Sequence, residues 1–464
     1  KVVTIIGAGM AGLVAASLLR QAGHTVDVLE ASERVGGRVL TLREPFTGDL
    51  YMEAGPMRVP STHRLINHYV QKFRLPISEF LSTTPNNIIY VNGVKVKERQ
   101  YEQHPEILNF PLPPRERGKS ASELFHYAVD PFLRLYNNAS SEEKERLIRE
   151  FDRYSFENFL LYNPFGHSIS HPAIDMIGII DGVRGFPELS FLQILFNIYQ
   201  YVENPETTFY AIDGGFDRLP DALYRQLSDV VYFNEEVTDI VAEDPYVFSY
   251  TKTKYGQKKR FQADHTIITV PFTVLRLINV FPKYYFSYKK RIAISDLHYT
   301  TATKVGIEFR SRFWEREGVY GGTLRTDLPI NVAYYPSRRP QKTGGPGVMI
   351  ASYTWEDGTL PWDSLSEEGR IIEALDSIAQ IHGDQVYREY VTGASKAWSQ
   401  DPLNGGGDFA FYRPNQRTYL KEAIMKPEGR IHFAGEHASD YHGWIEGAIQ
   451  SGVRTALEVH QSET

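Results

Sequence analysis

Residues 2–38 read VVTIIGAGMAGLVAASLLRQAGHTVDVLEASERVGGR, and this stretch decides the fold. The largely apolar run at 2–6 predicts a buried strand, residues 11–22 predict a helix, and residues 25–30 predict a second strand. A glycine cluster at 7–12 joins the first strand to the helix. This order predicts the start of a doubly wound parallel sheet, the core of an α/β domain.

Three glycines, Gly7, Gly9 and Gly12, form the pattern G-x-G-x-x-G at that turn. In nucleotide-binding folds the first permits a tight turn, the second lets pyrophosphate approach the backbone, and the third lets the helix pack closely on the strand. Glu30 ends the second predicted strand and offers a carboxylate to an adenosine ribose. A glycine-rich turn without a ligand is the alternative. We expect a dinucleotide site.

A second glycine pair, Gly36 and Gly37, lies between Arg34 and Arg38 in ERVGGR. The glycines allow close approach of the backbone, and the arginines offer fixed donor forks to phosphate. This second cluster favours a flavin dinucleotide over a nicotinamide dinucleotide.

The composition excludes several classes of protein. The 464 residues carry a net charge of -7, which argues against nucleic acid as a partner. The chain has no cysteine, so disulfides, thiolate metal sites and cysteinyl cofactor links are excluded. No run reaches about 18 apolar residues, and we expect no membrane span. We expect a soluble protein, either cytoplasmic or secreted, and no metal site.

Together the two glycine clusters resemble the signature of the flavin amine oxidase superfamily, in which they flank FAD. The resemblance covers nearly the whole chain, with the later segments in the expected order: GGFDRLPDAL, EEVTDI, IITVP, TKVGIEF, AWSQDP and FAGEHASDYHGWIEGAIQSG. Within that superfamily the chain is most similar to the L-amino acid oxidases. The resemblance implies FAD, held without a thioether link because cysteine is absent, and a homodimer or higher homo-oligomer.

The resemblance and the changes in residue pattern predict three domains. The expected FAD-binding domain, Rossmann-like in fold, joins three separate segments, and a sheet-based substrate domain joins two. A helical insertion completes the α/β plus α+β chain. The expected bounds are 1–41, 205–297 and 425–464 for the FAD-binding domain, 42–105 and 298–424 for the substrate domain, and 106–204 for the helical domain.

The resemblance also assigns the cofactor contacts. They fall in the two glycine clusters, the EAGPMR segment, one strand valine and the C-terminal motif. The assigned residues are Gly7, Gly9, Met10, Ala11, Gly12, Glu30, Ala31, Arg34, Gly37, Arg38, Gly55, Pro56, Met57, Arg58, Val237, Trp398, Gly435, Glu436, Gly443, Trp444 and Ile445.

Arg58, in EAGPMRVP, is the residue expected to bind the substrate carboxylate. An arginine among apolar residues needs a partner, and pattern alone leaves an internal salt bridge equally open. In L-amino acid oxidases the matching arginine binds the α-carboxylate. Tyr353 lies on a predicted strand and is expected to donate its hydroxyl to the same carboxylate, or else to pack in the core.

Lys304 alternates with apolar neighbours in TATKVGIEF. In related amine oxidases this lysine holds a water near the flavin, and a snorkelling surface lysine is the alternative. Trp355 and Trp444 are expected to line the pocket for the substrate side chain. His437 and His442 have no feature that orients them as bases, so ordinary polar contacts are expected of them.

The predicted function is FAD-dependent oxidative deamination of L-amino acids by dioxygen, with bulky apolar or aromatic side chains favoured. The catalytic residues would be Arg58, Tyr353 and Lys304. An amino acid 2-monooxygenase, a monoamine or polyamine oxidase, and a binding protein of the same fold without redox chemistry are the alternatives.

Overall fold

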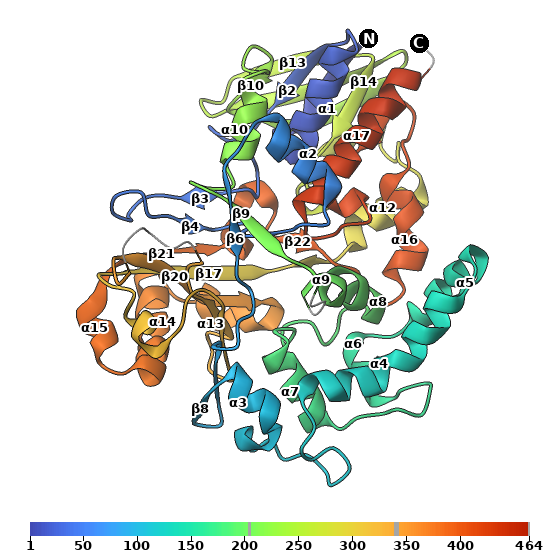
Figure 1. The fold of residues 1–464 in the computed structure, drawn as a ribbon. Helices are drawn as coiled ribbons and strands as arrows, with labels where there is room; N and C mark the ends of the chain where they lie inside the picture. Colours follow the sequence, from blue (N-terminus) through green and yellow to red (C-terminus); the bar gives the residue numbers. More distant parts are fainter. Residues whose placement is uncertain (203–205, 338–342, 463–464) are drawn as a thin grey trace.

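The computed structural model describes residues 1–202, 206–337 and 343–462. A parallel five-stranded sheet forms its upper layer in Figure 1, with both chain ends beside it. All four neighbouring strand pairs run parallel, which confirms the doubly wound sheet. In spatial order the strands are β10 (Val231–Tyr232), β2 (Thr25–Leu29), β1 (Val2–Ile6), β14 (His265–Ile268) and β23 (Ile431–Phe433).

Two helices from opposite ends of the chain pack together on this sheet (Figure 1). They are α1 (Met10–Gln21), the helix that follows the first glycine cluster, and α17 (Ile445–Gln461). Gly452 makes their approach possible, since a Cβ there would lie 2.5 Å from the carbonyl oxygen of Ala11. The C-terminal motif is therefore held beside the N-terminal one.

A four-stranded sheet extends the same layer in the order β13-β12-β11-β15. The basic segment 252–260 forms a hairpin whose turn contains Gly256 at a φ of +80°. The strands are β11 (Glu235–Glu243), β12 (Tyr246–Thr253), β13 (Lys258–Ala263) and β15 (Asn279–Phe281).

A seven-stranded sheet lies below the parallel sheet in Figure 1. Its second and third strands, β17 and β20, run antiparallel, and every residue of β17 is buried. In spatial order the strands are β21 (Tyr390–Ala397), β17 (Ala302–Phe309), β20 (Gly347–Trp355), β19 (Val332–Tyr334), β18 (Thr323–Thr326), β7 (Ile88–Val91) and β8 (Val94–Lys97).

Between residues 106 and 202 the described chain contains helices joined by loops, and the expected bounds 106–204 of a helical domain stay a prediction. Five of its helices begin at serine caps, which satisfy the first free backbone N–H groups. The elements are α4 (Ala121–Asn138), α5 (Ser141–Phe151), α6 (Phe156–Leu161), α7 (His171–Ile180), α8 (Phe191–Ile194), the π-helical turn η2 (Leu195–Tyr199) and α9 (Gln200–Val202).

Shorter elements connect these layers. The small sheets contain β3 (Thr41–Leu42), β4 (Met52–Glu53), β5 (Val59–Pro60), β6 (Ile77–Phe80), β9 (Phe209–Ile212), β16 (Tyr299–Thr300) and β22 (Phe409–Ala410). The other α-helices are α2 (Arg64–Lys72), α3 (Glu98–Gln103), α10 (Arg218–Tyr224), α11 (Phe272–Leu275), α12 (Tyr288–Asp296), α13 (Leu360–Asp363), α14 (Glu367–His382), α15 (Gln385–Glu389) and α16 (Gln416–Met425). None of the described helices combines the length and apolar character that crossing a membrane requires.

Candidate active site

A cavity of about 600 Å³ runs from the turn between β1 and α1 to the seven-stranded sheet. It collects residues from all the segments that the sequence predicted to meet there. Those lining it are Gly7, Gly9, Met10, Ala11, Glu30, Ala31, Arg34, Gly37, Arg38, Gly55, Pro56, Met57, Arg58, Val237, Lys304, Tyr353, Trp355, Gly435, Glu436, Gly443, Trp444 and Ile445. Chain segments far apart in sequence thus share one site.

The two glycine clusters dock on each other at the N-terminus of α1. The N–H of Gly36 donates to the carbonyl oxygen of Ala8 at 2.9 Å, and a Cβ on Gly37 would lie 3.6 Å from the Cα of Gly9. Gly9 is the helix cap, no side chain caps the helix, and a Cβ on Gly9 would meet no atom within 4 Å. The helix end is therefore open to the cavity and fits an anionic pyrophosphate.

Glu30 lies beside this cradle and is tied to it. One carboxylate oxygen accepts the N–H of Ala8 at 2.8 Å, and the other accepts the N–H and hydroxyl of Ser32 at 2.9 and 2.7 Å. A carboxylate has about four acceptor positions, so one remains for a ribose hydroxyl. The open helix end, the glycine cradle and this carboxylate together fit the adenosine diphosphate part of FAD.

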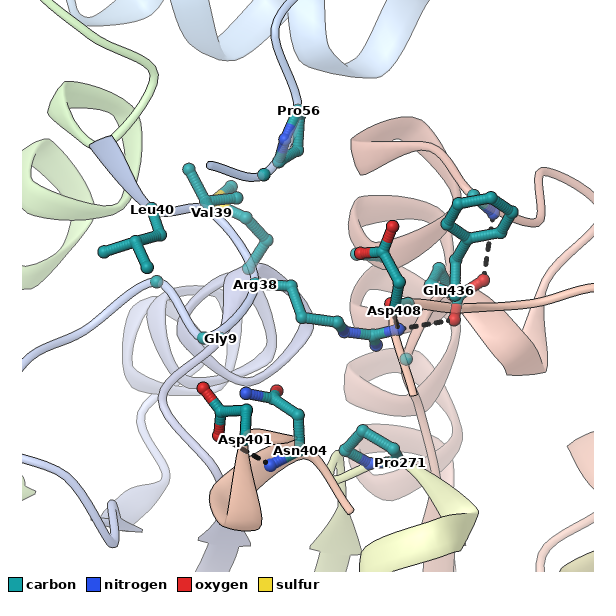
Figure 2. A pocket seen from close by; sticks show the side chains of 18 of the residues that line it. Gly9, Arg38, Val39, Leu40, Pro56, Pro271, Asp401, Asn404, Asp408 and Glu436 are labelled. Atoms are coloured by element: carbon teal, nitrogen blue, oxygen red, sulfur yellow. Dashed lines mark hydrogen bonds and ion pairs between the residues drawn. The ribbon is translucent and has the colours of Figure 1, made fainter. Parts of the chain in front are cut away.

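The two arginines of the second cluster bind protein groups as well as lining the cavity. Arg34 donates to three backbone carbonyl oxygens of its own loop, including that of Gly37 at 2.5 Å. Arg38 forms a 2.8 Å ion pair with Glu436 and donates to the carbonyl oxygen of Asp408 at 2.7 Å. Figure 2 shows Arg38 crossing the cavity toward Glu436. Protein acceptors therefore use part of the hydrogen-bonding capacity of both guanidinium groups.

Two residues predicted to contact the cofactor lie behind the cavity wall. Gly12 is not among the lining residues. A Cβ at this position would lie 2.1 Å from the carbonyl oxygen of Gly7, so the absence of a side chain allows α1 to pack closely on β1. Trp398 is 1% exposed, does not line the cavity and donates its indole N–H to the carbonyl oxygen of Ala54 at 2.9 Å. Both residues shape the wall from behind.

Lys304 is 1% exposed, so the interpretation as a surface lysine does not hold. Its Nζ donates to the carbonyl oxygens of Gly55 at 2.5 Å and Glu53 at 3.3 Å. Burial lowers the pKa of Lys304 to about 8, opposed by the charges of Asp408 and Glu53. Because an ammonium has three donors, one remains for the cavity.

Arg58 enters the cavity inside an aromatic cage. Its guanidinium carbon lies 4.9 Å from the ring centroid of Phe209, 5.5 Å from that of Tyr334 and 5.9 Å from that of Phe80. Its Nη1 donates to the hydroxyl of Ser82 at 2.7 Å. Within the part of the chain that the structure describes, Arg58 forms no ion pair, so the internal salt bridge left open by the sequence is not found.

Tyr353, Trp355 and Trp444 are aromatic residues that line the cavity. Lys304 Nζ lies 4.4 Å from the Tyr353 ring centroid, and the Tyr353 and Trp355 rings are 4.0 Å apart. Burial raises the pKa of Tyr353 well above its usual value, so its hydroxyl stays protonated and can donate. Trp444 donates its indole N–H to the carbonyl oxygen of Asn197 at 3.3 Å, which fixes its ring.

Neither histidine of the C-terminal motif lines the cavity. His442 contacts the side-chain oxygen of Gln193 and the carbonyl oxygen of His437, both at 3.1 Å. His437 is buried against Phe272, and burial holds its pKa well below the usual range. Polar contacts at His442 agree with the expectation, whereas the ring nitrogens of His437 have no partner.

Several lining residues were missed by the sequence reasoning. Tyr334 forms part of the cage around Arg58, and Asp408 directs its carboxylate into the cavity beside Glu436 (Figure 2). Burial raises the pKa of Asp408 to about 6. Asp181 and Arg325 line the end of the cavity near the helical insertion. Of these four residues, only Arg325 carried a signal in the sequence, because it is a charged residue within a β-strand pattern.

The fold and the site together define a class of protein: one that holds a dinucleotide between a parallel sheet and a second, substrate-facing sheet. The profile of the flavin containing amine oxidoreductase family matches residues 10–460. The chain belongs to this family. It is an oxidoreductase, and its cofactor is FAD.

Comparisons with individual proteins agree with the family. The chain is 44% identical over 462 residues to YobN of Bacillus subtilis (strain 168), named as a candidate L-amino-acid oxidase, covering 99% of this chain and 95% of that protein. It is 33% identical over 465 residues to the L-amino-acid oxidase of Mus musculus, covering 99% and 71%. Putrescine oxidase bound to putrescine shares the fold, with a TM-score of 0.81, 20% identity and coverage of 99% and 98%.

Removing the cradle should release FAD. Glu30→Ala removes the acceptor for Ala8, Ser32 and the ribose, and Gly12→Val forces a side chain into the carbonyl oxygen of Gly7. We expect both purified variants to show a reduced ratio of flavin to protein absorbance. Glu33→Ala, which removes only an exposed partner of Lys254, is the matched control and should stay yellow. Full flavin content in both site variants would contradict this placement.

Glu53 should make stability depend on pH. Its carboxylate accepts from the hydroxyl of Thr41 and the N–H of Phe216, and burial raises its pKa from 4.5 to about 8. Between these values the folded protein keeps a proton that the unfolded chain releases, so the free energy of unfolding falls as pH rises. Glu53→Gln removes this titration.

Chemical denaturation from about pH 5 to about pH 9 measures the effect. We expect wild-type stability, relative to the Glu53→Gln variant, to decline across this range. The exposed Glu44→Gln variant should run parallel to the wild type. A constant difference between the wild type and Glu53→Gln would show that Glu53 titrates normally.

Proposed function

We propose that this chain catalyses the oxidative deamination of L-amino acids by dioxygen, giving a 2-oxo acid, ammonia and hydrogen peroxide. The observation that carries the proposal is Arg58, a caged guanidinium that faces the cavity without an ion-pair partner among the described residues. A partly buried cation enclosed by aromatic rings needs an anion, and the α-carboxylate of an amino acid supplies one. An amine substrate lacks that group.

Arg58 and Tyr353 would fix the substrate by its carboxylate. The guanidinium offers two parallel N–H donors, and the protonated Tyr353 hydroxyl offers a third. The ring of Tyr334 packs against the guanidinium at 5.5 Å from its carbon, so less rotamer freedom is lost when substrate binds. Holding the carboxylate at this place sets the position of the Cα–H bond, which is the contribution of orientation to the rate.

Lys304 would hold a water in the cavity. Two of its donors are used by the carbonyl oxygens of Glu53 and Gly55, and the third faces inward. A pKa of about 8 lets this ammonium exchange its proton near neutral pH. The water is the reactant that hydrolyses the imine, giving the oxo acid and ammonia. When bound, FAD supplies the two-electron acceptor, and dioxygen takes these electrons as peroxide.

Trp355 and Trp444, with Phe186 and Phe411, supply apolar walls around the place of the substrate side chain. Such walls favour bulky apolar or aromatic side chains because burial of apolar surface stabilises the complex.

The products test the reaction class. Incubating the holoenzyme with L-methionine or L-phenylalanine should give oxo acid, ammonia and peroxide in equal amounts. Each turnover then consumes one dioxygen and one water. Amide and carbon dioxide as the main products would move the protein to the amino acid monooxygenases.

Arg58→Ala tests the substrate class. Truncating one partner of a buried charge pair costs roughly 2–5 kcal/mol. At about 1.4 kcal/mol per decade, kcat/KM for an L-amino acid should fall roughly tens to thousands of fold. FAD should stay bound because the glycine cradle is untouched.

The corresponding amine is the control substrate, and the variant Arg20→Ala, at a half-buried arginine paired with Asp229 outside the cavity, is the control protein. We expect the amine to react poorly with the wild type and to lose little in the Arg58 variant. An equal fall for both substrates would show that Arg58 supports the fold. A wild type that prefers the amine would overturn the proposed function.

A further inference from the structure

A second arginine, Arg325 on β18, lies on the cavity wall and is 8% exposed. Its Nη1 donates to the carbonyl oxygen of Ile180, and its Nε lies 3.4 Å from the hydroxyl of Thr323. Across residues 1–202, 206–337 and 343–462, Nη2 has no acceptor and the guanidinium forms no ion pair. A desolvated guanidinium in this state is costly unless the cavity brings it a partner.

The register of the seven-stranded sheet places Arg325 in the same row as the proposed catalytic residues. Arg325 pairs with Val332, Val332 with Tyr353, and Tyr353 with Lys304. Side chains paired across neighbouring strands share one face of a sheet, and all four of these residues line the cavity. Three strand spacings of about 4.8 Å separate the strands of Lys304 and Arg325, so the row spans about 14 Å.

Arg58 and Arg325 therefore line one cavity, and neither guanidinium forms an ion pair with a described residue. Tyr334, whose ring packs against Arg58, follows Val332 by two residues, so the two side chains lie on the same face of the sheet. The substrate α-carboxylate, which we propose binds Arg58, provides no partner for Arg325. Asp181 lies on the same wall, and its carboxylate accepts the hydroxyl of Tyr199 at 2.7 Å.

We propose that Arg325 is a specificity-determining residue that binds an acceptor oxygen at the end of the substrate side chain. This inference rests on the proposed function and adds a substrate class to it. Besides apolar amino acids, the cavity oxidises those whose side chain ends in a carbonyl or carboxylate oxygen, such as L-glutamine and L-glutamate. The aromatic walls hold the methylene stem, and the free Nη2 reaches the oxygen.

The carboxylate of Asp181 determines which of these two substrates reacts better. It lies on the wall that carries Arg325, so its negative charge disfavours a second carboxylate more than a neutral amide. L-Glutamine should therefore react better than L-glutamate.

Arg325→Met replaces the guanidinium by an apolar chain in the holoenzyme. We expect kcat/KM for L-glutamine and L-glutamate to fall roughly ten- to hundred-fold, the effect of losing one hydrogen bond to a charged group. L-Methionine, close in length to glutamine but without the oxygen, should change little. The binding of 2-oxoglutarate, a product that cannot be oxidised, should weaken by a similar factor in a flavin absorbance titration.

Arg184→Met is the matched control, because Arg184 is exposed, lies near the same wall and donates to the carbonyl oxygen of Asp327. An equal fall for all substrates would assign Arg325 to the α-carboxylate, and an unchanged glutamine to methionine ratio would leave it structural. Either result overturns the inference, as does a wild type that oxidises methionine but neither glutamine nor glutamate. A wild type inactive on every amino acid instead overturns the proposed function. If Arg325→Met loses flavin, Arg325→Lys, which keeps the charge, is measured with the same substrates.

Discussion

A buried ion pair between Arg38 and Glu436 is the interaction on which the site depends. One oxygen of Glu436 accepts from Arg38 and from the N–H of Ala410, and the other accepts the N–H of Gly443 at 3.0 Å. Three segments, near residues 38, 410 and 440, are thus joined at a point that neither sheet could fix alone. Charges this deeply buried contribute specificity of arrangement when every lone pair is used, and Glu436 comes close to that condition.

The placement of charge along the cavity follows from this junction. At one end the open N-terminus of α1 and the glycine cradle are suited to a diphosphate. At the other end the seven-stranded sheet carries Lys304 and the aromatic residues on a rigid β surface, with Arg58 positioned above it by a loop between β4 and β5. A rigid sheet keeps the row of reacting groups within the small displacements that orientation can tolerate.

Sequence reasoning recovered the parts of the molecule that depend on local pattern. The strand, helix and strand of residues 2–29 and the hairpin around Gly256 lie where the periodicity and the turn residues place them. Of the residues it assigned to the cofactor, all except Gly12 and Trp398 line the cavity, since these sit in short contiguous motifs. It missed Tyr334 and Asp408, whose relation to the site depends on strand register and on chain segments that meet only after folding.

The sequence by itself determined the class of cofactor, because the glycine clusters that form the dinucleotide cradle are contiguous in the chain. A single close contact can require a glycine at one position, as it does at Gly12, which packs against the carbonyl oxygen of Gly7. The sequence also marked Arg58 as an arginine in need of a partner. Only the tertiary structure decided that no carboxylate among the described residues supplies one, and that Arg325 stands in the row of Tyr353 and Lys304. The reason is physical: the partner of a buried charge is chosen by distances in space, and a strand's neighbours are set by sheet order rather than by chain order.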